Sequence, residues 1–478
     1  MSESIAKKAI KGTVWSACDR FGVMALQFAV NLILARLLTP TDFGTIGLLY
    51  IFMAVSQTFI DGGFGSALIQ KKNPTETDYS TIFYWNILIG LFFYGILFIS
   101  AHWISDFYHL PILSNILKVL GCSLVLYGMN AIQVNRLQKQ LKFNTLAKTN
   151  ISSYLMSASM TIFLAYNGYG VWSLVAMAIC QPAFRIIFLF ILTHWHPRLA
   201  FSVQSLKELL SFGGYLLIGN LLESIFKNIQ GLIIGRKFSA AQMGYYSQAD
   251  KLDQIVSYSI PQVISSVMYP VFSQYQDDKE RLRELMKYDF RVISFGIYPL
   301  LSCLIIVAEQ LILFLYGEKW LPSVPYFQIL CVGGFLYSIN NIAYYAVAAS
   351  GKSKALLGVA IYKWLMLGVF LIIGMNFGMK GIMWGIALSY WNIFFTNAIL
   401  AKKYVGITIN QIIISLLPAF LVSLGTAVIP SIGLMYLPHL WIIWILCYSA
   451  LYLILCWKFN RKGIEDVKLI ITKLINKE

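Results

Sequence analysis

Long apolar segments recur along almost the whole of this 478-residue chain. A helix needs about 20 consecutive apolar residues to span the hydrocarbon core of a bilayer. About fourteen segments meet that need, near residues 13–34, 44–67, 81–103, 113–134, 149–166, 171–193, 209–234, 244–272, 288–309, 323–349, 355–376, 381–400, 412–433 and 436–457. They lack the alternation of barrel strands, and a spanning segment must close its own backbone hydrogen bonds. The sequence therefore predicts an all-α integral membrane protein with about fourteen transmembrane helices.

The composition agrees with that fold and excludes several classes of function. Only 12% of the residues are charged, against about 25% in soluble domains. The net charge of +16 sits mostly in short loops between apolar segments, so we expect membrane lipids and no nucleic acid as partners. The cysteines form no CxxC pair and the histidines no HExxH motif, so we expect no metal site. Residues 350–353 resemble the end of a phosphate-binding loop, but Ala346 stands at the position of its first glycine; we expect no nucleotide or other cofactor.

The positions of the basic residues predict the topology. With a cytoplasmic N-terminus, 26 of the 37 lysines and arginines fall in inside segments and 5 in outside loops. Cytoplasmic loops carry the excess of positive charge in multi-pass proteins. We therefore predict that both termini are cytoplasmic.

A weak internal repeat predicts two related halves. The motif at residues 33–36, followed by Gly44, recurs at an offset of 200 as residues 233–236, followed by Gly244. Repeats with an even number of helices have the same orientation in the membrane. We predict a six-helix lobe in residues 1–200, a second in 201–403, and a central cavity between them. Residues 404–478 would add two helices and a basic cytoplasmic tail.

Ionisable residues inside the helices are the candidates for a functional site, because each is costly in lipid and usually faces a cavity or a partner. Arg20 and Gln27 share one face of the first helix, and Glu223 and Lys227 share one face of the seventh. At the offset of 200, Gln27 corresponds to Lys227. We interpret these faces as cavity walls; hydrogen bonding between helices of one lobe is the alternative.

The other candidates have two interpretations each. Lys251 precedes Pro261, and a proline permits a bend in a helix. This helix could therefore be a gate that presents Lys251 to the cavity. Alternatively, the charged residues at the start of this helix lie at the level of the outer lipid headgroups. Arg185 and Lys363 either reach the cavity or extend to the membrane surface. The complete set comprises the substrate-binding cations Arg20, Lys227, Lys251, Arg185 and Lys363, the polar or ion-coupling residues Asp19, Gln27, Asn31, Asn220, Glu223 and Asp250, and the hinge residues Pro261, Gly62 and Gly63.

Three segments near the N-terminus resemble the signature of the polysaccharide flippases. They are residues 37–44 (LLTPTDFG), 61–72 (DGGFGSALIQKK) and 79–86 (YSTIFYWN). These flippases belong to the multidrug/oligosaccharidyl-lipid/polysaccharide (MOP) exporter superfamily, whose fold is MATE-like. The resemblance implies alternating-access transport of undecaprenyl-pyrophosphate-linked oligosaccharide from the cytoplasmic to the periplasmic leaflet of a bacterial inner membrane. It also implies a proton or sodium gradient as the driving force, a role in lipopolysaccharide, capsule or exopolysaccharide synthesis, and contacts with polysaccharide polymerase machinery.

On this hypothesis Arg20 and Lys227 pair with the pyrophosphate, and Glu223, one turn from Lys227, is a proton switch. A lipid II flippase and a multidrug or small-solute exporter of the same fold remain alternatives. A membrane glycosyltransferase or polymerase belongs to a different class and usually needs a large extramembrane loop with acidic catalytic groups. The outside loops of this chain are short and poor in carboxylates, so we expect a transporter without catalytic residues.

Overall fold

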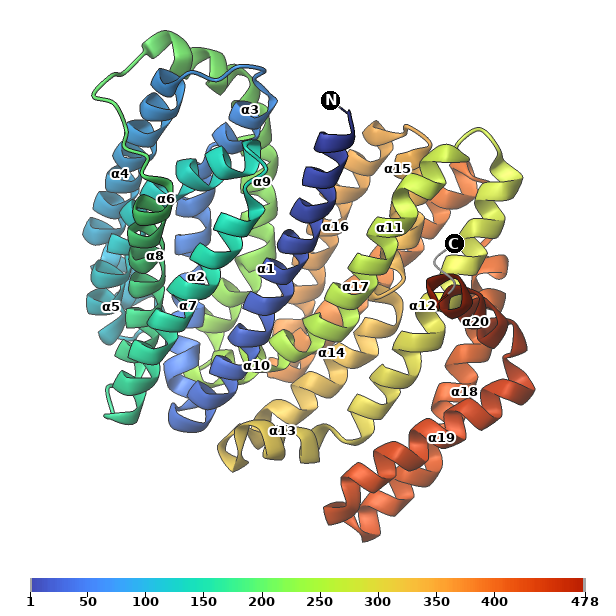
Figure 1. Cartoon of the computed structure of the whole chain (residues 1–478). Helices are drawn as coiled ribbons and strands as arrows, with labels where there is room; N and C mark the ends of the chain where they lie inside the picture. Colours follow the sequence, from blue (N-terminus) through green and yellow to red (C-terminus); the bar gives the residue numbers. More distant parts are fainter. Residues whose placement is uncertain (1, 476–478) are drawn as a thin grey trace. The chain divides into compact units, whose positions relative to one another are not determined.

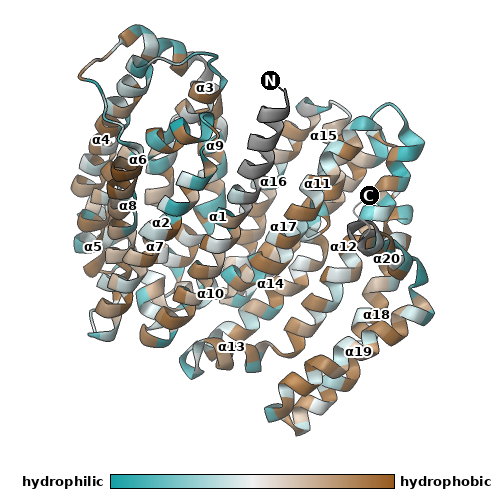
Figure 2. Ribbon diagram, viewed as in Figure 1, coloured by the Kyte–Doolittle hydropathy of each residue, from teal (hydrophilic) through white to brown (hydrophobic). Residues whose placement is uncertain are grey.

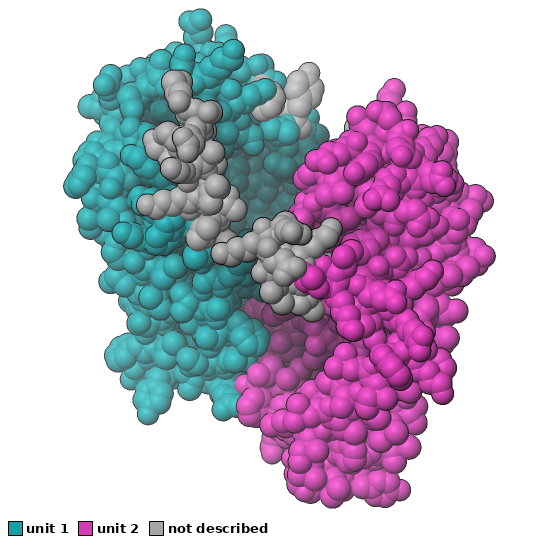
Figure 3. Space-filling view, turned by 45° about the vertical axis from the view of Figure 1, so that its right-hand side comes forward, with its two compact units in different colours: residues 1–244 teal, residues 245–478 magenta. Residues whose placement is uncertain are grey.

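The computed structural model describes residues 2–475, and within that range every regular element is a helix (Figure 1). The chain divides into two compact units, residues 1–244 and 245–478 (Figure 3). Unit 1 contains α1 (Ser2–Leu37), α2 (Pro40–Asp61), α3 (Phe64–Gln70), α4 (Glu76–Tyr108), α5 (Ile112–Leu120), α6 (Cys122–Lys139), α7 (Phe143–Tyr166), α8 (Val171–Thr193) and α9 (Val203–Lys237).

The helix α10 (Ala240–Gln254) begins in unit 1 and continues into unit 2. The other elements of unit 2 are the π-helix η1 (Ile255–Ser259), α11 (Ile260–Gln274), α12 (Lys279–Ile306), α13 (Ala308–Tyr316), the 3-10 helix η2 (Glu318–Ser323), α14 (Val324–Tyr337), α15 (Asn340–Ala349), α16 (Ser353–Gly374), the 3-10 helix η3 (Met375–Phe377), α17 (Gly378–Tyr404), α18 (Ile409–Tyr436), the 3-10 helix η4 (Pro438–Leu440), α19 (Trp441–Phe459) and α20 (Arg461–Ile475).

The helices have the length and apolarity of membrane spans. In the described part of the chain, 11 segments could cross a membrane, or 12 if the bent α9 is one span. Lys354–Tyr404 counts as one segment although it contains α16 and α17, and α7, which carries Lys148 and Asn150, is outside the set. In Figure 2 apolar residues cover the helices, and hydrophilic residues gather at many of their connections. The multi-pass, all-helical fold is confirmed, while fourteen spans and cytoplasmic termini stay predictions.

Unit 1 is organised around three groups of packed helices. The helix α7 packs against α1 and α8, α4 packs against α5 and α6, and α2 packs against α9. Capping boxes start α2 and α4, where the side chains of Thr39 and Thr75 accept hydrogen bonds from the backbone N–H groups of Asp42 and Asp78. The α8–α9 connection is anchored by Trp195, which is buried in a core cluster with Phe64 and Tyr79. These contacts fix the start of α2 at one end of unit 1, and the start of α4 and the α8–α9 connection at the other end (Figure 1).

The two glycines of the internal repeat meet where α2 crosses α10 in unit 1. A Cβ on Gly44 would overlap the carbonyl oxygen of Ala240, and a Cβ on Gly244 would overlap the carbonyl oxygen of Pro40. The two contacts exchange roles at the offset of 200, as expected where two copies of one motif meet. Only glycine allows backbones to approach so closely. The lobe boundaries at 200 and 403 are a different division from the compact units and stay predictions, as does the cavity between the lobes.

Unit 2 contains an irregular helix and a docked C-terminal helix. The π-helix η1 immediately precedes Pro261, which lies in the first turn of α11. The helix α12 packs against α14, α18 and α20. The ion pair between Arg291 Nε and Asp466 Oδ2, at 2.5 Å, joins α12 to α20. Most of the predicted basic tail is therefore the helix α20, and Lys477 lies outside the described residues.

Candidate functional site

A polar cavity of about 380 Å³ lies within unit 1, where α1, α7 and α8 pack together. Two residues that the sequence singled out, Gln27 and Arg185, line this cavity. The full lining consists of Val23 and Gln27 of α1, Asn150 and Tyr154 of α7, and Met177, Ala178, Gln181 and Arg185 of α8. The site is thus assembled from α1 and from the consecutive helices α7 and α8, which lie more than 100 residues further along the chain.

Helical periodicity explains why these side chains meet. Val23 and Gln27, Asn150 and Tyr154, and Gln181 and Arg185 are pairs four residues apart. Residues at that spacing lie on one face of a helix. Each of the three helices therefore presents a short polar or mixed face to the same space.

Asp19 approaches this site from α1, one turn before Val23. Its two carboxylate oxygens accept hydrogen bonds from Asn150 Nδ2 at 3.0 and 2.9 Å. The guanidinium of Arg185 interacts electrostatically with Asp19 and with Tyr127. In the described part of the chain, Arg185 Nε and Asn150 Oδ1 are buried and have no hydrogen-bond partner. Because buried polar groups are normally paired, the site has unused capacity for an anion, a cation or water.

A second carboxylate lies at the end of α2. Asp61 Oδ2 accepts a hydrogen bond of 2.9 Å from the hydroxyl of Tyr127 in α6. The chain then turns through Gly62 and Gly63, whose φ angles of 52° and 71° are left-handed. Such values favour glycine. Tyr127 thus donates a hydrogen bond to Asp61 and also interacts electrostatically with Arg185.

The hinge candidates Gly62 and Gly63 contact the bend of α9. A Cβ on Gly63 would overlap the carbonyl oxygen of Gly213. Gly213 lies between the two straight parts of α9, Val203–Ser211 and Leu216–Lys237, which meet at 63°. The geometry places the glycine turn against a break in a long helix, and its role as a hinge stays a prediction.

The remaining unit 1 candidates lie outside this cavity lining. Arg20 is exposed, and Asn31 is half-buried in α1. On α9, Asn220, Glu223 and Lys227 are all exposed, and no ion pair joins Glu223 to Lys227 in the described structure. The exposed side chains of Arg20, Asn220, Glu223 and Lys227 are accessible to a ligand. Arg20 is next to Asp19 in the chain, but it does not share the face of α1 on which Asp19 contacts Asn150.

In unit 2 the candidates occupy two places. Lys251 is exposed and interacts electrostatically with Asp250, whose Oδ2 accepts a hydrogen bond of 2.7 Å from Gln254 Nε2. One turn on, Asp253 is 1% exposed and accepts a hydrogen bond of 2.6 Å from Ser257 in the π-helix. Lys363 of α16 lies 4.4 Å from the centre of the Trp364 ring, a cation–π contact.

Sequence reasoning missed Asn150, Tyr154, Gln181 and Tyr127. The spacing of four residues between Asn150 and Tyr154, and between Gln181 and Arg185, was a usable signal. The three side chains Asn150, Tyr154 and Gln181 are neutral, so the cost of burying a charge, which marks the ionisable candidates, does not single them out. No group of three or more metal-ligating side chains occurs among the described residues.

The comparisons with known proteins point to polysaccharide biosynthesis. A family model described as "Polysaccharide biosynthesis protein" matches residues 33–325. The teichuronic acid biosynthesis protein TuaB of Bacillus subtilis is 27% identical, with 73% of each chain covered. The lipopolysaccharide biosynthesis protein WzxC of Escherichia coli is 26% identical, over 89% of this chain and 87% of its own.

Solved structures share the fold. The lipid II flippase MurJ, in an inward closed conformation, gives a TM-score of 0.76 at 16% identity, over 94% of this chain and 100% of its own. An inward-facing multidrug resistance MATE transporter of the MOP superfamily gives 0.63 at 15% identity, over 80% of this chain and 94% of its own. At these identities the likeness concerns the fold alone, and it agrees with the MATE-like fold that the resemblance to the polysaccharide flippases implied.

Proposed function

Because the chain belongs to the polysaccharide biosynthesis protein family and is a membrane transporter of that process, we propose that it flips a lipid-linked oligosaccharide from the cytoplasmic to the periplasmic leaflet. The proposed carrier lipid is undecaprenyl pyrophosphate, and the proposed membrane is the bacterial inner membrane. The named processes of its relatives, teichuronic acid and lipopolysaccharide biosynthesis, support a glycan as cargo. The observation that carries the proposal is this family match together with the charged, polar cavity inside unit 1.

A cationic site supports a pyrophosphate as the recognised group. Among the described residues, no hydrogen-bond partner reaches the buried Nε of Arg185, and Arg20 and Lys227 are exposed on α1 and α9. Guanidinium and ammonium groups form strong, charge-assisted hydrogen bonds with phosphate oxygens. In this proposal Arg185 and Lys227 hold the pyrophosphate while the hydrocarbon chain remains in lipid.

Asp19 is the residue we propose for coupling to an ion gradient. Its carboxylate is held by Asn150 and lies within the electrostatic reach of Arg185. Protonation of Asp19 would remove the negative charge that partly neutralises Arg185, and the guanidinium would then favour an anion more strongly. One charge moved through the membrane potential is worth about 2.3 kcal/mol per 100 mV, which is enough to bias such a cycle. Sodium in place of the proton would use the same oxygens.

The finer topology belongs to the same proposal. We propose fourteen spans with both termini in the cytoplasm, and a change of access that uses the Gly62–Gly63 turn and the break before Pro261. The left-handed glycines and the π-helix η1 support these positions, because irregular backbone marks places where a helix can bend. Contact with a polysaccharide polymerase would then deliver the flipped unit to its next step.

Complementation tests this function. A bacterial host that lacks its own polysaccharide flippase would express this chain, and surface glycan and accumulated lipid-linked intermediate would be measured together. We expect rescue by the wild type, and reduced rescue by Arg185→Ala, Lys227→Ala and Arg20→Ala, which each remove a cation. Asp19→Asn and Glu223→Gln, which remove the two candidate coupling carboxylates, should also reduce rescue. Lys118→Ala is the matched control, since Lys118 contacts the Phe98 ring away from the cavity lining.

Two results would contradict the proposal. Wild-type rescue by all three cation variants would exclude the proposed cationic site, while the proposed transport of the glycan lipid would stand. Failure of the inserted wild-type protein in hosts with several different glycans would favour the alternatives, a lipid II flippase or a multidrug exporter, whose fold the chain shares.

A further inference from the structure

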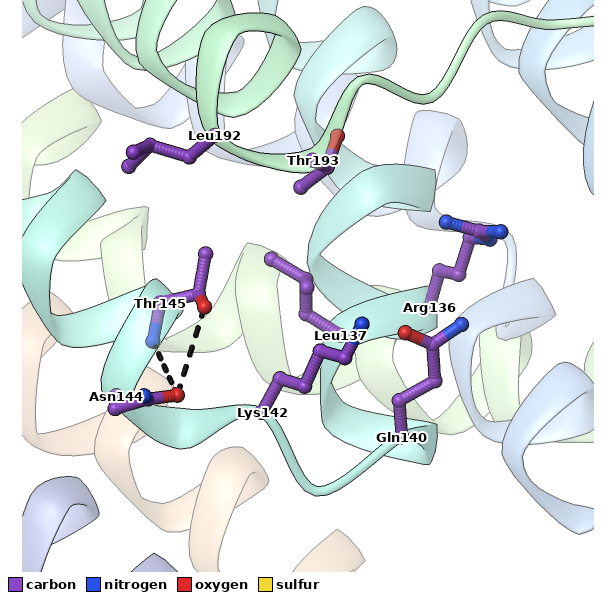
Figure 4. Close-up of a pocket in the computed structure, with 8 residues that line it drawn as sticks. All are labelled: Arg136, Leu137, Gln140, Lys142, Asn144, Thr145, Leu192 and Thr193. Carbon is purple, nitrogen blue, oxygen red and sulfur yellow. Dashed lines mark hydrogen bonds between the residues drawn. The ribbon is translucent and has the colours of Figure 1, made fainter.

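A second cavity in unit 1, of about 250 Å³, lies where α6 ends, α7 begins and α8 ends (Figure 4). None of its lining side chains is acidic and two are basic. The lining consists of Arg136, Leu137 and Gln140 at the end of α6, Lys142, Asn144 and Thr145 at the start of α7, and Leu192 and Thr193 at the end of α8. The proposed transport function makes no use of this cavity, which is separate from the one that contains Arg185.

The α6–α7 turn holds an unfavourable backbone conformation beside this cavity. Leu141 has a φ of 56°, a left-handed value at a position where helices usually end in glycine. The backbone N–H of Lys142 donates to the carbonyl of Leu137 at 2.9 Å, which closes the turn. As Figure 4 shows, the side chains of Gln140 and Lys142 both extend toward the side of the cavity where Arg136 lies. The turn thus directs three nitrogen-bearing side chains to one region.

Arg136 is fixed in place before any ligand arrives. Its Nη2 donates to Glu76 Oε1 at 3.0 Å, and the indole N–H of Trp195 donates to Glu76 Oε2 at 2.7 Å. Its guanidinium also lies over the rings of Tyr79 and Trp195, at 5.9 and 5.6 Å. Within the described residues, Arg136 Nε is buried and has no hydrogen-bond partner. Arg136 is therefore a rigid donor with unused capacity, and rigid donors bind with a smaller loss of entropy.

The chemistry of the walls selects the ligand. Guanidinium, ammonium, amide and hydroxyl groups all donate hydrogen bonds, and phosphate oxygens accept them. The start of α7 adds the positive end of a helix dipole. Two exposed leucines accompany these groups: Leu192 belongs to the lining and is 45% exposed, and Leu141, between Gln140 and Lys142 in the chain, is 47% exposed. Polar walls with exposed apolar side chains beside them fit an amphiphile better than a free phosphate ester.

We propose that this cavity binds the phosphoryl headgroup of an anionic phospholipid, with Arg136 and Lys142 as its cationic partners and the acyl chains beside Leu141 and Leu192. Lys139 at the end of α6 and Lys148 in α7 belong to the same segment of the chain, which is predicted to be cytoplasmic. Basic residues there are attracted to the anionic lipids of that leaflet. The inference does not depend on the transported substrate.

The test is a titration of the purified full-length chain in detergent with phosphatidylglycerol, with bound lipid counted by native mass spectrometry. We expect Lys142→Gln to weaken the tightest-bound phosphatidylglycerol about fivefold, the effect of one basic residue near a lipid surface. Lys148→Gln is the matched control, because Lys148 is an exposed lysine of α7 outside the cavity lining, and it should bind like the wild type. Lys142 is itself exposed, so its replacement leaves the packed core intact.

Two further arms identify the source of the phosphoryl group. Displacement of the lipid by water-soluble glycerol phosphate would support the phosphoryl site with a soluble phosphate ester as a second ligand. Loss of phosphatidylglycerol in Lys142→Gln without such displacement would support the lipid as the sole ligand. Equal binding by Lys142→Gln and Lys148→Gln, or equally tight binding of zwitterionic phosphatidylcholine, would overturn the proposal.

Discussion

The interaction of Asp19 with Arg185 can be measured by a double-mutant cycle. The variants are Asp19→Asn, which is nearly isosteric, Arg185→Gln, which is a shorter neutral polar side chain, and the double variant. Either single replacement leaves one charge in the apolar interior of unit 1 without its counter-charge, which is destabilising. The double replacement removes both charges, so it should cost less than the sum of the two.

The structure sets the size of the expected coupling. Asp19 and Arg185 interact electrostatically but form no direct ion pair in the described structure. At a separation of about 4 Å and an effective dielectric constant of about 20, two charges interact by about 4 kcal/mol. A more distant pair interacts less, and the Asn150 hydrogen bonds already stabilise the carboxylate. We therefore expect a coupling energy of about 1–3 kcal/mol.

Equilibrium unfolding in mixed detergent and sodium dodecyl sulfate micelles, followed by tryptophan fluorescence, supplies the four free energies of unfolding. Asn150→Ala is a useful fifth variant, since it should destabilise the wild type and leave Asp19→Asn less affected. Additive single effects, within about 0.3–0.5 kcal/mol, would show that the two charges act independently. The proposed link between protonation of Asp19 and anion binding at Arg185 would then lose its physical basis.

Two other predictions follow from the packing and the topology. Gly244→Ala should destabilise unit 1 by about 2–4 kcal/mol, because the new Cβ would overlap the Pro40 carbonyl oxygen. The control Gly358→Ala, whose Cβ would meet nothing within 4 Å, should be neutral or stabilising. The unfolding midpoints of the two variants are compared, and equal midpoints would refute the close α2–α10 crossing. The orientation can be tested in a chain whose seven cysteines are replaced by alanine. A membrane-impermeant thiol reagent added to spheroplasts should label Asn167→Cys but not Asp277→Cys. The reverse pattern would contradict the predicted orientation.

The sequence alone determined the fold class and the family resemblance. Apolar segments of about 20 residues exclude any soluble core, and the predicted segments 171–193 and 412–433 lie within α8 and α18. The interruption expected at Pro261 is present as the π-helix η1, because a proline removes a backbone donor wherever the helix packs. The glycines that mark the repeat likewise meet in the structure, since their lack of a side chain is a local property with a local consequence.

Only the tertiary structure decided which polar side chains share a site. From the sequence we predicted that Arg20 and Lys227 face one cavity, whereas the structure brings Asp19, Gln27 and Arg185 together around Asn150. Helical spacing shows which residues share a face of one helix, but it does not show which helix that face meets. That choice depends on the long-range packing of α7 against α1 and α8, where side-chain shape and close contact, and no pattern within any single helix, select the neighbours.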